Sequence, residues 1–280
     1  MSIKNFHQMK DLFDSTPDIK NRLYLTFSKI DNGIKLFKYL KTMILKYKMK
    51  NDKQMYERLQ KNYKIMTLAE ENYDSKQKSY LMYRGLNRAN NIINITNNLG
   101  IKNIKNYLDI GTGNGMIAES IGKKFNLDWE QIHCLDVESC VIDRIGKCNF
   151  QIYDGINIPL NKNSIDLITL FMVLHHVKEL KKLLKSIHKV LSPDGILIIR
   201  EHDANSDDIK TLIDVQHALY SILHVGQEYD FFRKTYYANY YSKEELDKYL
   251  IEAGFKQKDI NHGIRFSKNP LNYYYSVWGK

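Results

Sequence analysis

The sequence predicts an α/β fold on a parallel sheet, with helices over residues 1–100 in front of it. From residue 104 onward, short apolar runs bounded by turns alternate with segments of helical periodicity, which is typical of β/α units. The first hundred residues have helical patterns and no strand followed by glycines. With 280 residues, 43% of them hydrophobic, the chain is long enough for one large domain with an appended piece.

Helical signals run through residues 1–100, which we expect to form an extension or cap. Residues 16–18 read Thr-Pro-Asp, the hydroxyl, proline and acid of a helix start. Residues 34–47 place apolar side chains at helical spacing with lysines between them, and a helix over 80–99 should end at Gly100. Packing by the apolar face is favoured for the basic helix, with membrane or RNA contact as the alternative.

Five strands are expected in the parallel part of the sheet. Each is a short apolar run bounded by turn residues, and helical periodicity fills most of the gaps between them. In order, the predicted strands are 104–110, 132–136, 150–153, 166–171 and 196–200. The predicted helices are 115–124, 139–146 and 180–191, the last of which ends at a Pro-Asp-Gly sequence.

The remaining segments predict an insertion, a helix and a hairpin. Ser242 and Glu245 have capping-box spacing, and Gly254 supplies the stop for the helix that they open. Two apolar runs after this helix would meet across a turn that contains proline. In order, the expected parts are an insertion over 203–241 with a helix at 206–224, and antiparallel strands at 256–266 and 271–278.

The most informative motif is a glycine loop after the first strand. Residues 107–115 read Tyr-Leu-Asp-Ile-Gly-Thr-Gly-Asn-Gly, so Asp109 ends the strand and glycines follow at alternate positions. Glycine lets the backbone turn sharply and approach a ligand closely. Asp136 ends the next apolar run, where a carboxylate can accept both hydroxyls of a ribose. These features resemble the cofactor cradle of class I methyltransferases, which bind S-adenosylmethionine (SAM).

The resemblance covers residues 104–280 and implies a Rossmann-like sheet closed by the C-terminal hairpin, in a SAM-binding domain over 101–280. Charge favours SAM over a dinucleotide, because Asp109 would repel a pyrophosphate and attract the cationic amino group of SAM. Asp154 also suits a simple turn, and Phe171 a core position. The implied cofactor residues are Asp109, Gly111, Gly113, Asn114, Gly115, Asp136, Val137, Asp154, Gly155 and Phe171.

Two adjacent histidines follow the fourth strand. His175 and His176 would point in different directions on one helix and have no convergent cysteine or acid, so no metal site is predicted. The resemblance implies that one histidine lies near the cofactor or acceptor while the other packs. His175 is the candidate catalytic residue of the pair.

The end of the fifth strand carries the most unusual polar group in the chain. Parallel sheets place their ligands at the carboxyl ends of strands. We predict His202 as a general base, oriented by Asp203 or Glu201, with Arg200 as a substrate contact. A polar strand end held by loop hydrogen bonds is the alternative.

The insertion is rich in tyrosine and is interpreted as a substrate lid. Its rings would exclude water from the reaction, or stack on a flat acceptor as in nucleobase recognition. The predicted acceptor contacts in the insertion are His217, Tyr220 and Tyr240. The residues expected to reach the carboxylate of the cofactor are Tyr80, Tyr83 and Arg84.

The predicted function is methyl transfer from SAM to an oxygen or nitrogen, with a small-molecule acceptor favoured by the paired histidines and the lid. The fourth strand lacks the Asn/Asp-Pro-Pro-Tyr motif of adenine methylation, and the chain lacks the Pro-Cys of cytosine-C5 methylation. An RNA or mRNA-cap methyltransferase is one alternative, because the net charge is +10. A lysine-rich composition bias explains this charge equally well. A non-catalytic binding subunit with the same fold is the other alternative.

Cysteine usage and hydropathy predict a cytoplasmic protein. Cys134, Cys140 and Cys148 have no CxxC spacing, suit a reducing compartment, and predict neither a disulfide nor a zinc site. The first residues lack the apolar run of a signal peptide. The longest apolar run, 165–174, contains an acid and is too short to span a bilayer. The oligomeric state is left open by the sequence.

Overall fold

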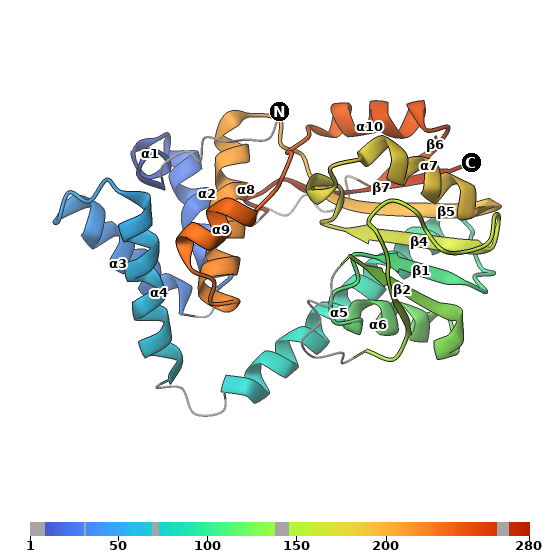
Figure 1. The fold of residues 1–280 in the computed structure, drawn as a ribbon, viewed down its shortest axis with the longest axis horizontal. Coiled ribbons are helices and arrows are strands. Elements are labelled where there is room, and N and C mark those ends of the chain that lie inside the picture. Colours follow the sequence, from blue (N-terminus) through green and yellow to red (C-terminus); the bar gives the residue numbers. More distant parts are fainter. Residues whose placement is uncertain (1–8, 31, 69–72, 138–145, 262–268) are drawn as a thin grey trace. The chain divides into compact units, whose positions relative to one another are not determined.

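A computed structural model of the protein describes residues 9–30, 32–68, 73–137, 146–261 and 269–280. The chain folds into two compact units, each assembled from segments that are distant in the sequence. The helical unit comprises Met1–Tyr73, His202–Ser242 and Arg265–Asn272, and the sheet unit comprises Asp74–Glu201, Lys243–Ile264 and Tyr273–Lys280. Figure 1 colours the chain along its length, so the interleaving of early and late segments can be followed there.

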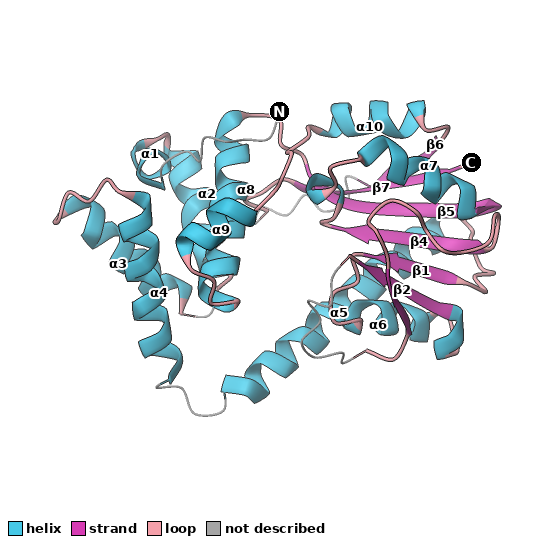
Figure 2. Ribbon diagram, in the orientation of Figure 1, coloured by secondary structure: helices cyan, strands magenta, loops and turns pink. Residues whose placement is uncertain are grey.

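The sheet unit is built on a seven-stranded sheet with the order β3-β2-β1-β4-β5-β7-β6. Strands β1 to β5 pair in parallel, and β6 and β7 form an antiparallel pair. This arrangement confirms the predicted α/β fold with a C-terminal hairpin (Figure 2). The strands are β1 (Tyr107–Ile110), β2 (Ile132–Asp136), β3 (Asn149–Ile152), β4 (Ile165–Phe171), β5 (Leu191–His202), β6 (Lys256–Asn261) and β7 (Tyr273–Gly279).

Burial and register explain why polar residues gather at one edge of this sheet. All four residues of β1 are buried, as expected for a central strand with both faces covered. In register, Asp109 of β1 lies opposite Cys134 of β2 and Thr169 of β4. The carboxyl ends of these parallel strands therefore meet along one edge, where the glycine loop and Asp136 also lie.

Helices cover both faces of the sheet. On one face, α5 (Tyr73–Asn98) and α6 (Met116–Lys124) contribute Ala89, Ile92 and Ile121 to the core. On the other face lie α7 (Leu180–Val190) and α10 (Lys243–Glu252) (Figure 1). Four apolar side chains at helical spacing are buried on one face of α7, as the sequence predicts: Leu180, Leu183, Leu184 and Ile187.

The helical unit joins the N-terminal helices to the insertion. Gln60 on α4 donates from Nε2 to the carbonyls of Ile222 at 2.8 Å and Gln227 at 3.0 Å. Thr16 caps α2 by accepting from the backbone of Ile19, as the Thr-Pro-Asp start predicts. The helices are α1 (Met9–Asp14), α2 (Pro17–Ser28), α3 (Gly33–Leu45), α4 (Asp52–Leu68), α8 (Asp207–Leu219), a π-helical turn (Tyr220–His224) and α9 (Tyr229–Thr235).

Several elements differ from the sequence predictions, and β1 begins at Tyr107 instead of residue 104. Helix α5 belongs to the sheet unit, although the sequence groups it with the helices over 1–100. Strand β5 begins at Leu191 instead of residue 196, because Leu191 pairs with Ile165 before a shift in register absorbs the proline. The helix predicted over 206–224 ends its regular part at residue 219 and continues as the π-helical turn. The helix predicted at 139–146 lies almost entirely outside the described residues.

The expectation of no disulfide is wrong. Cys134 on β2 and Cys148, just before β3, form a disulfide with their Cα atoms 6.2 Å apart. The pairing of β2 with β3 brings them together, since Cys134 lies opposite Phe150 in register. A separation of 14 residues has no signature of its own, so this pairing could not be predicted from the spacing of the cysteines. Cys140 lies outside the described residues.

Helix length and hydropathy address the question of a membrane span. No helix of the described residues is both long enough and apolar enough to cross a bilayer.

Candidate functional site

The loop between β1 and α6 has three glycines in the left-handed region. Their φ angles are +70° at Gly111, +57° at Gly113 and +78° at Gly115. A Cβ at Gly111 would collide with the side chain of Val173, and one at Gly115 would lie 3.2 Å from Sγ of Cys148. A Cβ at Gly113 would meet nothing within 4 Å. The middle glycine therefore leaves open space beside the backbone, as a closely bound ligand requires.

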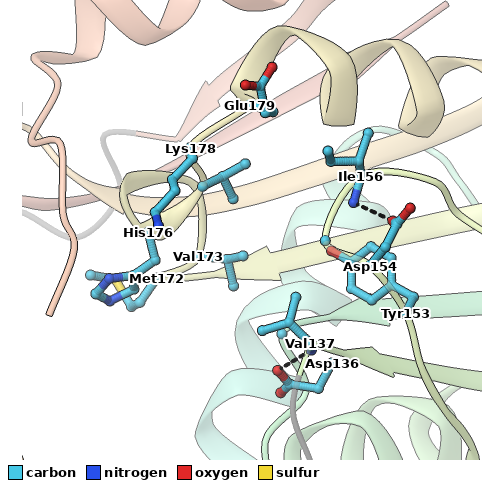
Figure 3. Close-up of a pocket in the computed structure, with 13 residues that line it drawn as sticks. Asp136, Val137, Tyr153, Asp154, Ile156, Met172, Val173, His176, Lys178 and Glu179 are labelled. Carbon is cyan, nitrogen blue, oxygen red and sulfur yellow. Dashed lines mark hydrogen bonds between the residues drawn. The ribbon is translucent and has the colours of Figure 1, made fainter. Parts of the chain in front are cut away.

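A cavity of about 580 Å³ opens beside this loop at the carboxyl ends of β1, β2, β3 and β4. Figure 3 shows the side chains that surround it. Gly111 contributes from the glycine loop. The lining residues that matter most for the site are Asp136, Val137, Tyr153, Asp154, Met172 and His176.

Asp136 is held rigidly at the end of β2. Its Oδ2 accepts from the backbone N–H of Gly113 at 2.9 Å. Its Oδ1 accepts from the backbone N–H of Val137 at 2.8 Å, as Figure 3 shows. Each carboxylate oxygen keeps a further lone pair, so the group can accept from two neighbouring hydroxyls. Val137 is 53% exposed and lines the same cavity, where it offers an apolar surface.

Asp154 lines the cavity and also forms a turn. Its carboxylate accepts from the backbone of Asn157 at 2.6 Å, from the side-chain amide of Asn157 at 2.6 Å, and from the backbone of Ile156 at 2.8 Å. These hydrogen bonds, led by the one from the Asn157 backbone, lower the pKa of Asp154. Gly155 follows with φ +80°, beside Val137. The side chain thus has the turn role that its sequence allows, at the position where the family resemblance places a cofactor ligand.

Asp109 lies behind the glycine loop as a buried acid. Thr169 donates to its Oδ1 at 2.5 Å, and the hydroxyl of Tyr107 lies 2.7 Å from Thr169. Burial raises the pKa of Asp109 to about 6, so the carboxylate is ionised at neutral pH. A buried negative charge at this position favours a cation next to the loop.

The end of β4 has a strained residue that the sequence does not reveal. Met172 adopts φ +64°, donates from its backbone N–H to the carbonyl of Arg200 at 2.9 Å, and lines the cavity. Left-handed residues other than glycine concentrate at functional sites, but methionine carries no sequence signal for this conformation. Phe171, predicted as a cofactor contact, packs against the core with its ring edge-to-face to Tyr275 at 6.4 Å.

Of the two histidines after β4, His176 is the one that lines the cavity. His175 is 3% exposed, and its Nδ1 lies 2.7 Å from Oε2 of Glu201. The other oxygen of Glu201 accepts from the backbone of Leu174 at 2.9 Å. Glu201 was one of two acids expected to orient His202. It contacts His175 instead. The sequence analysis identified both histidines but chose the buried His175 as the catalytic candidate, whereas His176 lines the cavity.

His202 and the predicted acceptor contacts His217 and Tyr240 come together in the helical unit. The rings of His202 and His217 are 6.2 Å apart, and those of His217 and Tyr240 are 6.0 Å apart. Nδ1 of His202 lies 2.9 Å from the carbonyl of Leu271. A carbonyl can only accept, so Nδ1 of His202 is the donor in this contact.

The other predicted residues occupy different places. Asp203 accepts from the side chain of Asn205 at 3.2 Å, and Tyr220 is 58% exposed next to His224. Asn114 accepts from the backbone of Met116 at the start of α6. On α5, three residues predicted to reach the cofactor are exposed: Tyr80, Tyr83 and Arg84. The buried Arg200 lies in the sheet unit against Tyr273.

Comparison with known proteins identifies one matching family. A sequence model of the methyltransferase domain matches residues 58–258. The chain is 35% identical over 96 residues to the mitochondrial arginine-hydroxylase NDUFAF5 of Mus musculus, a match that covers 32% of this chain and 27% of that protein. The chain therefore spans about a quarter of the length of that relative.

Two further comparisons cover more of the chain. The demethylmenaquinone methyltransferase of Staphylococcus epidermidis is 24% identical over 221 residues, covering 66% of this chain and 88% of that protein. Among solved structures, a SAM-dependent methyltransferase from Clostridium acetobutylicum aligns with a TM-score of 0.48 and 14% identity, covering 68% of this chain and 89% of that chain.

Proposed function

The chain belongs to the class I SAM-dependent methyltransferases, and on this premise we propose that it moves a methyl group from SAM to an oxygen or nitrogen of a small-molecule acceptor. The observation that carries the proposal is the cavity at the carboxyl edge of the sheet. There the carboxylate of Asp136 and the apolar side chain of Val137 lie together, and Gly113 donates its backbone N–H to that carboxylate.

The donor set of this cavity fits the cofactor. We assign the ribose hydroxyls to Asp136, because each of its oxygens is oriented by a backbone N–H and retains a lone pair. We assign the adenine to the apolar surface of Val137 and to the turn at Asp154. The buried carboxylate of Asp109 supports the cationic amino group, and the open space at Gly113 supports close approach by the methionine part.

The chemistry places few demands on the protein. SAM, when bound, supplies a methyl group on a positively charged sulfur. Positive charge diminishes as the methyl leaves, so the residues around it mainly align the acceptor and exclude water. For an acceptor that arrives protonated, we propose His202, the last residue of β5, as the general base.

The names of the relatives support a small-molecule acceptor and suggest hydroxylation as the competing reaction. The Staphylococcus relative is named for demethylmenaquinone, a small molecule, and the match extends over most of that protein. The mitochondrial relative is named as a hydroxylase, so the added group has to be identified as methyl. A net charge of +10 keeps RNA as an acceptor to be tested.

Calorimetric titration with SAM tests the cofactor assignment. We expect Asp136→Ala to weaken binding by about tenfold or more, because the fixed hydrogen-bond acceptor for the ribose is lost. Asp194→Ala, an exposed acid at the amino end of β5, is the matched control and should bind normally. Wild-type protein that does not bind SAM, or equal binding by the two variants, would refute the assignment.

Mass spectrometry of incubated acceptors tests the reaction. Wild-type protein with SAM should add the mass of a methyl group to a phenol, quinol or amine. Addition of an oxygen atom would indicate hydroxylation instead. Methylation of RNA alone, with binding that falls steeply as salt rises, would replace the small-molecule proposal.

A further inference from the structure

Three arginines of the sheet unit gather beside the C-terminal part of the sheet, and we call them the arginine cluster: Arg84, Arg88 and Arg200. Arg84 and Arg88 lie one turn apart on α5 and so share a face of that helix. Arg200 lies near the carboxyl end of β5, opposite Phe171 of β4 in register.

Arg200 is a buried cation with an unused donor. Arg200 is 8% exposed, and its guanidinium carbon lies 3.9 Å from the centre of the Tyr273 ring. Its Nε is buried and has no hydrogen-bond partner. A buried donor without a partner costs free energy, and more so on a charged group. The guanidinium is therefore held in place by Tyr273 while its Nε–H lacks an acceptor.

Arg88 approaches the same strand from α5. It donates from Nη1 to the hydroxyl of Tyr275 at 3.2 Å, and Asn91 donates to that hydroxyl at 3.3 Å. Tyr273 and Tyr275 lie two residues apart on β7, so their side chains share the face of the sheet that α5 covers. Because the Tyr275 oxygen accepts twice, its own proton is left to donate to a further acceptor.

The described part of the chain supplies no carboxylate that pairs with the cluster. Among the residues that the structure describes, no aspartate or glutamate forms an ion pair with Arg84, Arg88 or Arg200. Burial, followed by the charge of Arg88, lowers the pKa of Arg200 to about 10, which leaves it protonated at neutral pH. Like charges gathered without a carboxylate are stabilised by an anion from outside the chain.

We propose that the arginine cluster binds an anionic group, a carboxylate or a phosphate, on the acceptor. The proposal rests on the function proposed above. A guanidinium offers a planar pair of N–H donors that matches both groups. Arg200 belongs to β5, whereas the cofactor residues Asp109 and Asp136 end β1 and β2, and β4 lies between them in the sheet order. The cluster is thus placed to hold an acceptor that approaches the cofactor from the β5 side.

Titration with inorganic phosphate and with benzoate tests the site at constant ionic strength. Protein saturated with S-adenosylhomocysteine is used, because the carboxylate of the cofactor product is then already bound. We expect saturable binding of at least one anion. Arg88→Gln and Arg200→Met should each weaken it by about tenfold, with S-adenosylhomocysteine affinity within about twofold of wild type. Lys185→Gln, which removes an exposed charge on α7, should change neither.

The outcomes separate the possible occupants. If neither anion binds the saturated wild-type protein, or both variants bind as wild type does, the proposal is overturned. A loss of S-adenosylhomocysteine affinity in both variants would assign the cluster to the carboxylate of the cofactor instead. If Arg200→Met does not fold, the half-buried Arg88 still decides the question. If S-adenosylhomocysteine fails to bind, the proposed function falls, while anion binding to the free protein still tests the site.

Discussion

At the scale of single residues, two glycines with similar backbone conformations allow the effect of strain on stability to be distinguished from the effect on ligand binding. Gly113 has φ +57° and Gly100 has φ +68°, and a Cβ at either would meet nothing within 4 Å. Alanine at each position should cost a similar 1 kcal/mol or so of stability. Only Gly113→Ala should also weaken SAM binding, by about tenfold, because its methyl enters the space of the ligand. Equal calorimetric affinities for the two variants would contradict this use of the loop.

The buried charge of Asp109 predicts a pH dependence for cofactor binding. Because burial raises its pKa to about 6, the carboxylate is ionised at pH 8 and becomes neutral as the pH falls through 6. The affinity for SAM should therefore fall between pH 7 and pH 5. Asp109→Asn should bind more weakly at pH 8, by about tenfold, and vary little over this range. Calorimetry at several pH values measures both, and an unchanged pH profile in the asparagine variant would argue against contact with the cationic amino group.

The sequence predicted which strand ends border the cavity better than it predicted which individual side chains line it. Asp136 and the glycine loop could be found because their spacing follows from strand ends that meet at one edge. Met172 could not, because methionine carries no sequence signal for the left-handed conformation that it adopts beside the Arg200 carbonyl. The choice between His175 and His176 required the contact of His175 with Glu201, which joins residues 26 positions apart.

At the scale of elements, the disulfide ties β2 to the segment before β3 and lies behind the glycine loop. Sγ of Cys148 lies 3.2 Å from the position of a Cβ at Gly115. Reduction should lower the free energy of unfolding of the sheet unit by about 3 kcal/mol, the value expected for a closed loop of this length. Denaturant titrations with and without reductant measure the difference. A Cys134→Ser, Cys148→Ser double variant should give the same curve in both, and a difference there would point to another cause.

Local patterns predicted the elements, and long-range contacts decided their boundaries and partners. The runs at β2 and α7 were placed within a residue because their periodicity is strong. Strand β5 extends past its proline because Leu191 finds a partner in Ile165, a contact that no local pattern encodes. The insertion likewise shows its partner only in three dimensions, through Gln60 of α4.

At the scale of the whole molecule, the two units carry different spectroscopic reporters. Both tryptophans of the chain, Trp129 and Trp278, belong to the sheet unit. Their fluorescence therefore follows unfolding of that unit. Far-ultraviolet circular dichroism also detects α1 to α4, α8 and α9 of the helical unit. A change that affects only the helical unit should shift the unfolding curve measured by circular dichroism and leave the curve measured by tryptophan fluorescence unchanged.

Two acids of the helical unit, the buried Asp214 and the half-buried Asp52, predict that the stability of this unit depends on pH. Burial raises the pKa of Asp52 to about 6 and that of Asp214 to about 7. The folded helical unit therefore keeps protons that the unfolded chain releases near pH 4. Its stability should fall as the pH rises from about 4 to about 7, and stay reduced above that. Each unit of pKa shift corresponds to about 1.4 kcal/mol, so the effect is large enough to measure.

Asparagine at position 214 tests this prediction directly. Tyr240 donates to Oδ1 of Asp214 at 2.8 Å, and an amide oxygen can accept the same hydrogen bond without a charge. Asp214→Asn should therefore be more stable than wild type at pH 8, and its free energy of unfolding by circular dichroism should vary less between pH 5 and pH 8. The tryptophan signal should be unaffected. Asp230→Asn, at an exposed acid of the same unit, should keep the wild-type slope. If the free energy of unfolding of Asp214→Asn varied with pH as steeply as that of the wild type, the carboxyl of Asp214 would not be the group that titrates.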